Sequence, residues 1–167
     1  MSLVTLLGGA RSGKSALAVR LGGDVATLIA TATAGDAEME ERIRRHRAER
    51  PAAWVTVEEP LELRPALAAL DPGETAVVDC LSLWVSNLIA EGWGNEAIEE
   101  EGQAVAALAA GRPGLTVVVS NEVGLGIVPV TPLGRRYRDV LGRVNTAFAL
   151  ASERALLVVA GRTLELG

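Results

Sequence analysis

Apolar and polar residues alternate along the chain in short and long blocks, which predict strands and helices respectively. Short, mostly apolar blocks occupy residues 3–7, 25–31, 54–58, 75–79, 115–120, 155–160 and, at the end of the chain, 162–166. Longer blocks with helical spacing occupy residues 15–21, 36–50, 60–70, 82–91, 95–110 and 135–153. Apolar strands that alternate with helices predict an α/β fold, in which helices cover both faces of a mostly parallel sheet.

The first strand and the first helix are joined by Gly-Gly-Ala-Arg-Ser-Gly-Lys-Ser, which matches the phosphate-binding P-loop pattern G-x-x-x-x-G-K-[ST]. Glycines allow backbone angles that a Cβ forbids, so successive N–H groups can surround one anion. We expect Lys14 to reach the β- and γ-phosphates and the Ser15 hydroxyl to bind Mg²⁺. The alternative is a glycine-rich turn that binds nothing. The nucleotide-binding residues predicted here are Gly8, Gly9, Ala10, Arg11, Ser12, Gly13, Lys14 and Ser15.

Asp79 ends the apolar block at 75–79, and this position is typical of the Walker B carboxylate that holds Mg²⁺ or its water. It also precedes a predicted helix, so an N-cap is the alternative. In parallel sheets ligands bind where the strands end. Thr31, Asp79 and the pair Asn121–Glu122 all follow predicted strands, so the sequence predicts one site at this edge of the sheet.

Composition limits the remaining classes of protein. The chain has 167 residues, which suits one domain over residues 1–167, and its formal net charge of −5 argues against a general nucleic-acid surface. Its single cysteine, Cys80, excludes an internal disulfide and favours a reducing, cytoplasmic setting. No apolar run approaches the roughly 20 residues of a membrane span, and no signal peptide is visible.

His46 is the only histidine in the chain, and it lies in a charged predicted helix. Acid-to-base pairs spaced four residues apart, such as Glu38–Arg42, are typical of a solvated helix face. However, five arginines between 42 and 50 surround His46, and guanidinium groups match phosphate oxygens. They also favour a neutral imidazole, which can attack phosphorus. The residues alone leave both readings open.

The glycine- and proline-rich stretch 121–134 is either a plain surface connection or a functional loop. Asn121 and Glu122 at its start favour a substrate or catalytic role, with Glu122 as acceptor of a hydroxyl proton. Four arginines follow on the next predicted helix, where Asp139 is spaced to pair with Arg135 and Arg143. Phosphate contact and a solvated face are both open for them.

Several strings together resemble one family, the bifunctional adenosylcobinamide kinase / adenosylcobinamide-phosphate guanylyltransferase of cobalamin biosynthesis. They are the P-loop at 8–15, Ile29-Ala-Thr31, the run from Glu38 to Pro51 with His46, Asn121-Glu-Val-Gly124 with Gly126-Ile-Val-Pro129, and Gly142-Arg-Val-Asn145. The resemblance runs nearly end to end. It implies a recombination-ATPase-like P-loop fold and a homotrimer.

The resemblance also implies two reactions. ATP or GTP phosphorylates adenosylcobinamide, and then a histidine takes GMP from GTP and passes it to the phosphorylated substrate. The matching histidine is His46, because Arg45 stands where the family often has a second histidine. The implied nucleotide-binding residues beyond the P-loop are Ala30, Thr31, Ala32, Arg47, Ala48, Glu49, Arg50, Glu58 and Asp79. Mg²⁺ is the implied cofactor, and a corrinoid the implied substrate.

Two other classes of protein remain as alternatives. One is a P-loop small-molecule kinase without the guanylyltransferase step. The other is a nucleotide-binding switch, which the absence of an Asn-Lys-x-Asp string weakens.

Overall fold

A computed structural model of the protein describes residues 3–33 and 50–167, which form one seven-stranded sheet in the order β3-β2-β4-β5-β1-β6-β7. All neighbouring strands are parallel except β6 and β7. The P-loop strand β1 lies between β5 and β6, with Gly8 in register with Asn121. The strands are β1 (Leu3–Gly8), β2 (Thr27–Ala30), β3 (Val55–Glu58), β4 (Ala76–Asp79), β5 (Thr116–Asn121), β6 (Arg154–Val159) and β7 (Arg162–Glu165).

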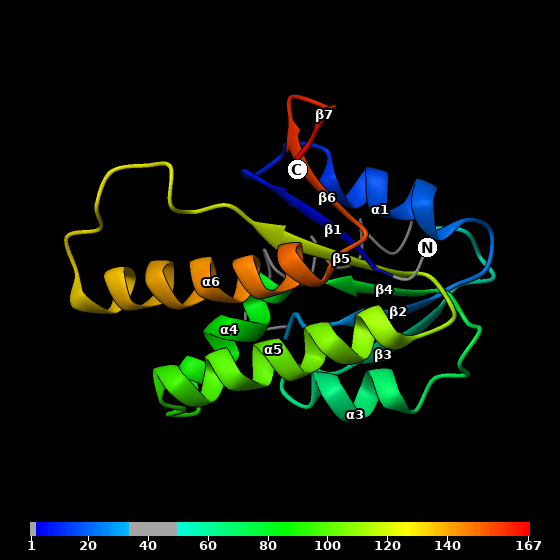
Figure 1. Cartoon of the computed structure of the whole chain (residues 1–167), viewed down its shortest axis with the longest axis horizontal. Coiled ribbons are helices and arrows are strands. Elements are labelled where there is room, and N and C mark those ends of the chain that lie inside the picture. Colours follow the sequence, from blue (N-terminus) through cyan, green and yellow to red (C-terminus); the bar gives the residue numbers. More distant parts are fainter. Residues whose placement is uncertain (1–2, 34–49) are drawn as a thin grey trace.

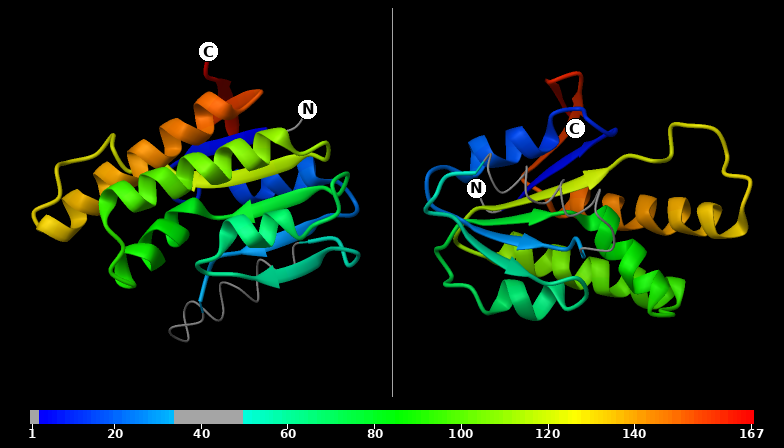
Figure 2. Two further views of the ribbon diagram at one scale, coloured as in Figure 1. Left: turned by 60° about the horizontal axis from the view of Figure 1, so that its bottom comes forward. Right: turned by 180° about the vertical axis from the view of Figure 1, so that it is seen from behind.

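The described helices are distributed unequally over the two faces of the sheet. Figures 1 and 2 show α1 on one face and α3, α4, α5 and α6 on the other. Their bounds are α1 (Lys14–Gly22), α3 (Leu63–Ala68), α4 (Leu81–Ala90), α5 (Asn95–Gly111) and α6 (Pro132–Ala151). The predicted α/β fold, with a mostly parallel sheet between helices, is therefore confirmed. None of the helices in the described part of the chain is long and apolar enough to cross a membrane.

Each face of the sheet has its own apolar core. On the α1 face, Val4, Leu6 and Val158 of the strands pack with Leu17 of the helix. On the other face, Trp84 and Phe148 are fully buried among aliphatic side chains of α3 to α6. Each such side chain contributes about 1.5–3 kcal/mol when fully buried. Successive side chains of a strand point to opposite faces of the sheet. Because helices cover both faces, the strands are apolar on both sides.

Two helices begin three residues away from the expected position. The helix expected from residue 60 begins at Leu63, because the Glu59 carboxylate accepts hydrogen bonds from the Leu61 and Glu62 N–H groups and forms a turn first. The helix expected from residue 135 begins at Pro132, where the Thr131 hydroxyl caps it by accepting from the Gly134 N–H at 3.1 Å.

The last strand, β7, is antiparallel, because Ala160 and Gly161 form a two-residue turn with φ angles of 49° and 76°. The helix expected over 36–50 lies outside the described residues, except for its last position.

Candidate nucleotide site at the carboxyl edge of the sheet

The P-loop leaves β1 at Gly8 and enters α1 at Lys14, as the motif predicts. Gly8 has φ 155°, and a Cβ there would stand 2.3 Å from the carbonyl oxygen of Val158 on β6. Gly13 has φ 103°, a backbone conformation that L side chains rarely adopt. Glycine is therefore required at both positions, by close packing at the first and by backbone angle at both.

Lys14 is buried inside this loop. Its Nζ donates hydrogen bonds to the Gly8 carbonyl at 2.9 Å and the Gly9 carbonyl at 2.6 Å, and lies 3.4 Å from the Ser12 hydroxyl. A buried ammonium is held at the point where the loop N–H groups and the α1 N-terminus also favour an anion. The loop is thus arranged to bind phosphate.

Asp79, the predicted Mg²⁺ ligand at the end of β4, lies next to the P-loop. The Ser15 hydroxyl donates to Asp79 Oδ2 at 3.4 Å, so α1 and β4 bring a hydroxyl and a carboxylate together. The N-cap of α4 is Cys80 rather than Asp79, so the alternative interpretation of Asp79 as a helix cap is wrong. Two hard oxygen ligands beside a phosphate site are the donor set that Mg²⁺ prefers.

A pocket of about 290 Å³ extends from this pair along the α1 face of the sheet. Leu28 and Val77 form its floor, and Arg50 and Trp54 line it with Ser15 and Asp79. The pocket therefore brings together three residues predicted from the sequence: Ser15, Asp79 and Arg50.

Trp54 in this pocket was missed by sequence reasoning. Its indole N–H donates to the Gly23 carbonyl at 2.9 Å, and its ring occupies the place that a side chain on Gly22 would need, 2.6 Å from a Cβ there. The available signal was an aromatic residue just after Arg50-Pro51, opposite a double glycine.

The end of β2 is tied to the start of α4. The Thr31 hydroxyl donates to the Cys80 carbonyl at 2.7 Å and accepts from the Cys80 N–H at 2.8 Å. Asn87 donates to the Thr31 carbonyl at 2.9 Å. Thr31 is fully buried, and its two hydrogen bonds hold the backbone of Cys80, the residue after Asp79, in place. Burial, and secondarily the charge of Asp79, raises the pKa of the Cys80 thiol.

The remaining β2 and β3 positions follow the same edge. Ala30 is in register with both Asp79 and Glu58, and Ala32 follows Thr31 beyond the strand. Glu58 ends β3 and is exposed. All of these residues lie at the carboxyl edge, as predicted.

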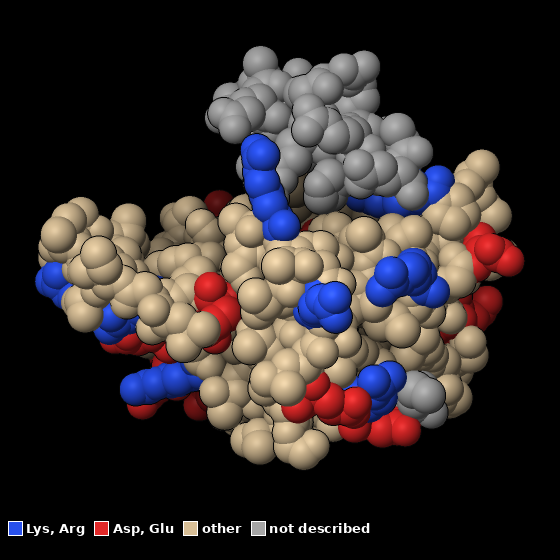
Figure 3. All heavy atoms as spheres, turned by 90° about the horizontal axis from the view of Figure 1, so that it is seen from above, with Lys and Arg blue, Asp and Glu red and all other residues tan. Residues whose placement is uncertain are grey.

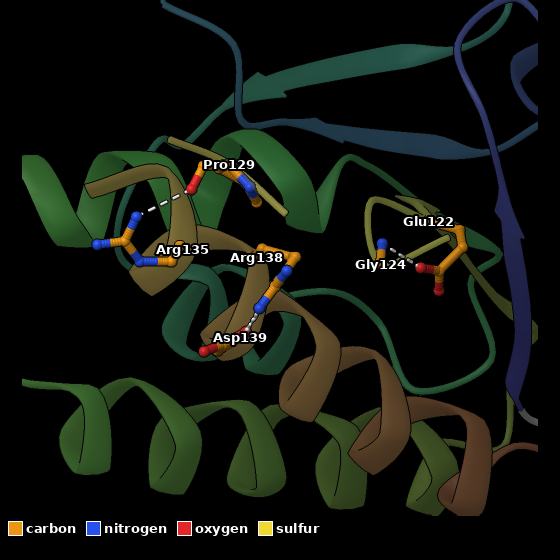
Figure 4. A network of polar contacts seen from close by, with 6 residues as sticks. All are labelled: Glu122, Gly124, Pro129, Arg135, Arg138 and Asp139. Atoms are coloured by element: carbon orange, nitrogen blue, oxygen red, sulfur yellow. Dashed lines mark hydrogen bonds and ion pairs between the residues drawn. The ribbon is translucent and has the colours of Figure 1, made fainter. Parts of the chain in front are cut away.

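Asn121 and Glu122 lie beside the P-loop strand, which confirms the expected neighbourhood of β5 and β1. The Glu122 N–H donates to the Gly8 carbonyl at 3.1 Å. The Glu122 carboxylate accepts a hydrogen bond from the Gly124 N–H, which folds the chain back at the start of the following loop (Figure 4).

That loop, residues 122–131, projects from the body of the molecule before α6 begins, and we call it the arm (Figure 1). Its side chains Leu125, Ile127 and Val130 are exposed by 84%, 96% and 92%. Arg135 of α6 holds the base of the arm by donating to the Pro129 and Val130 carbonyls (Figure 4).

The ion pairs expected from Asp139 to Arg135 and Arg143 are wrong. Asp139 pairs with its neighbour Arg138 at 2.9 Å, and Arg143 pairs with Glu99 on α5, because α5 packs along α6 and offers a carboxylate there. Arg136 donates to Asn95 and to the Trp93 carbonyl. Arg136 and Arg143 therefore hold α6 to α5 and to the segment just before it.

Some of the predicted site lies outside the described residues. This part comprises His46, Arg47, Ala48 and Glu49, together with the expected Glu38–Arg42 pair.

Comparison with known proteins bears on this geometry. The family described as cobinamide kinase / cobinamide phosphate guanyltransferase matches residues 4–166. The chain belongs to this family.

Three relatives agree with the family match, and each is named a bifunctional adenosylcobalamin biosynthesis protein. CobP of Pseudomonas aeruginosa is 45% identical over 165 residues, covering 96% of this chain and 95% of the relative. CobU of Escherichia coli and CobU of Salmonella typhimurium are each 38% identical over 174 residues, covering 95% of this chain and 96% of each relative.

Family membership confirms the expected enzyme class. The protein is a nucleotide-using transferase of the cobinamide kinase and guanylyltransferase type. The alternative of a nucleotide-binding switch is set aside.

Proposed function

We propose that this chain phosphorylates adenosylcobinamide with ATP or GTP and then attaches GMP to the product, giving adenosylcobinamide-GDP. The observation that carries the proposal is the convergence of buried Lys14, the Ser15–Asp79 pair and Glu122 at one edge of the sheet. The family to which the chain belongs carries both reactions in its description.

In the kinase step, the substrate's hydroxyl oxygen bonds to the γ-phosphorus of the nucleotide. The bond from this phosphorus to its bridging oxygen breaks, and the nucleoside diphosphate leaves. Lys14 neutralises charge that builds on the phosphate oxygens, while the P-loop N–H groups orient them. Glu122, which adjoins Gly8 through its own N–H, accepts the hydroxyl proton.

In the transfer step, a nitrogen of the His46 imidazole bonds to the α-phosphorus of GTP, and pyrophosphate leaves. A phosphate oxygen of the phosphorylated substrate then displaces the histidine and takes the GMP. Splitting the reaction in this way replaces one difficult encounter with two easier ones. Arg50 lines one pocket with Ser15 and Asp79, and we expect its guanidinium to contact the same nucleotide.

Mg²⁺ fits this site because the Ser15 hydroxyl and the Asp79 carboxylate supply hard oxygen ligands next to the phosphate loop. When bound, the ion neutralises negative charge on the phosphates. The part of the chain that the structure describes contains no group of three or more His, Cys, Asp or Glu side chains suited to a metal. Mg²⁺ typically keeps several waters and binds substrate phosphates, so two protein ligands suffice.

The decisive experiment removes the only histidine. His46→Asn enzyme, incubated with α-³²P-GTP and Mg²⁺, should acquire no label and release no pyrophosphate, whereas wild type should carry label that is acid-labile and alkali-stable. The variant should still phosphorylate adenosylcobinamide, because Lys14 and Mg²⁺ held by Ser15 and Asp79 can position the γ-phosphoryl group and neutralise its charge without an imidazole. Normal labelling of the variant would overturn the assignment. A wild type that phosphorylates but never labels would select a simple kinase.

We also propose that the protein is a homotrimer in which the arm contributes to the contacts between copies. The arm carries Leu125, Ile127 and Val130 almost fully exposed, and Figure 3 shows its end of the molecule as mostly uncharged. Exposed apolar patches of this kind mark interaction surfaces. Light scattering should give three times the chain mass, and Ile127→Asp should lower it. A monomeric wild type would refute the assembly.

A further inference from the structure

Strand β5 extends beyond the end of its neighbour β4 at the carboxyl edge of the sheet. Asp79, the last residue of β4, is in register with Val119, whereas β5 continues to Asn121. Backbone groups of successive residues in a strand point to alternate neighbours. The Glu122 N–H is directed to Gly8 on β1, so the N–H and carbonyl of Asn121 point to the other side, where β4 has already ended.

Two side chains from different helices bind these unpaired groups. Ser82 of α4 accepts from the Asn121 N–H at 2.7 Å. Asn145 of α6 donates to the Asn121 carbonyl at 3.0 Å, and its own Oδ1 accepts from the Ser120 hydroxyl at 2.6 Å. Ser82, Ser120 and Asn145 are 2%, 0% and 4% exposed. Buried polar side chains are therefore used to fix the backbone of a single residue.

The residue so fixed faces the phosphate site. Asn121 is in register with Gly8, the first residue of the P-loop, and Glu122 is bonded to the same glycine. The Asn121 carboxamide has no hydrogen bond with any residue among 3–33 and 50–167 and remains half-buried, so it is available to a ligand.

We propose that Ser82 and Asn145 are positioning residues for phosphoryl transfer. They hold the Asn121 backbone so that its carboxamide and the Glu122 carboxylate stand in register with the P-loop. The proposal rests on the role given to Glu122 under the proposed function. Misplacing a reacting group by about 1 Å can cost roughly 10²-fold in rate, so a fixed strand end is of direct value to the reaction.

A purely structural role is the competing explanation. Leaving a buried backbone donor without a partner costs about 1–3 kcal/mol wherever it occurs. The chain offers a matched control in Ser152, whose hydroxyl is bonded to Thr5 at 2.7 Å and donates to the Phe148 carbonyl at 2.7 Å. Ser152 lies at the end of α6, just before β6 begins, and so at the opposite edge of the sheet.

The experiment compares Ser82→Ala with Ser152→Ala. We expect both to lower thermal stability, but only Ser82→Ala to lower the kinase kcat, by about tenfold or more, with the KM for nucleotide little changed. Asn145→Ala should show the same division between kcat and KM. Equal kcat values in the Ser82→Ala and Ser152→Ala enzymes would overturn the proposal.

A double-mutant cycle tests whether Ser82 acts through Glu122. In a Glu122→Gln background, Ser82→Ala should reduce kcat further by much less than it does alone, because the group that it positions is already lost. If Ser82→Ala lowers kcat by the same factor in both backgrounds, Ser82 does not act through Glu122. If Glu122→Gln alone keeps full kcat, the proposed base is wrong, and the same cycle with Asn121→Ala then decides the positioning role.

Discussion

Among residues 3–33 and 50–167, one buried cation lies at each edge of the sheet, and the two cations are held differently. At the carboxyl edge, Lys14 is bonded to the Gly8 and Gly9 carbonyls of a loop. At the amino edge, Arg112 follows α5 and donates to the Leu67, Asp71 and Glu74 carbonyls at 2.8, 3.2 and 2.7 Å. Lys14 and Arg112 are 7% and 6% exposed, so burial alone does not distinguish them.

The two cations differ in whether they can exchange their carbonyl partners for the oxygens of a ligand. An ammonium is a compact charge on a flexible stem, which can turn from loop carbonyls to phosphate oxygens at little cost. The planar guanidinium of Arg112 fits three carbonyls at once, at the end of α3 and in the turn before β4, and so ties these two segments together. The carboxyl edge is therefore built for ligand exchange, and the amino edge for stability.

The largest effect expected at the carboxyl edge comes from Lys14→Ala. Removing one donor to the transferring phosphate typically costs about 10²–10³ in rate, so kinase turnover at saturating nucleotide should fall by that factor. The melting temperature should change little, because the Gly8 carbonyl keeps its hydrogen bond from the Glu122 N–H and Gly9 is exposed to water. Steady-state kinetics and thermal unfolding measured on one preparation check this. Turnover close to wild type would remove the P-loop role of Lys14.

Arg112→Leu should have the opposite signature. It leaves three carbonyls without their charged donor, so we expect the free energy of unfolding to fall by about 3 kcal/mol. The kcat of the folded enzyme should be unchanged, because Arg112 lies at the edge away from the P-loop.

Arg64→Leu is the matched control for Arg112. Arg64 forms a surface ion pair with Glu101 at 3.0 Å, and such a pair contributes less than about 1 kcal/mol. Urea unfolding of both variants compares them. If both variants lose the same free energy of unfolding, the three buried hydrogen bonds of Arg112 contribute no more than a surface ion pair.

Asp79→Asn tests the carboxyl edge less drastically. The amide keeps the shape and the contact with Ser15 but loses the charge, so the Mg²⁺ concentration needed for half-maximal kinase rate should rise by about tenfold. Stability should be retained, since Asp79 caps no helix. An unchanged Mg²⁺ requirement in a destabilised protein would contradict the proposed ligand.

The features predicted correctly from the sequence are those that depend on local patterns. The P-loop depends on glycines within eight consecutive residues, and the strand ends follow from apolar blocks, so Lys14, Ser15 and Asp79 could be placed together without a structure. Parallel strands end at one edge, which made the neighbourhood of Glu122 predictable as well.

Contacts between distant helices could not be predicted in this way. Asp139 has two arginines at helical spacing, yet Glu99 on α5 takes Arg143 because tertiary packing brings it closer. Ser82 and Asn145 lie 63 residues apart in the printed sequence, and neither carries a pattern that marks a hydrogen bond to Asn121. Arg112 likewise looks like an ordinary residue after a helix until its three carbonyls are seen.

The smallest effect expected concerns Tyr137, a structural group at the carboxyl edge. Its hydroxyl donates to the Ser82 carbonyl at 3.1 Å. Burial, followed by the charge of Cys80, raises the pKa of Tyr137 from its ordinary value of 10.0 to about 12. Between these values the unfolded chain has lost the phenolic proton while the folded protein keeps it. The free energy of unfolding of wild type should therefore fall as the pH rises through this window.

Tyr137→Phe separates the two contributions of this residue. Below about pH 9 the variant should be less stable than wild type by about 1 kcal/mol, the net contribution of one hydrogen bond. The difference should shrink as the pH approaches 12, because phenylalanine has no proton to lose. Urea unfolding at several alkaline pH values measures it, and absorbance of the phenolate reports the ionisation of the only tyrosine in the chain. A stability difference that stays constant with pH would show that Tyr137 ionises alike in both states. The carboxyl edge would then owe no stability to a buried neutral phenol, and its contrast with the amino edge would be sharper than proposed.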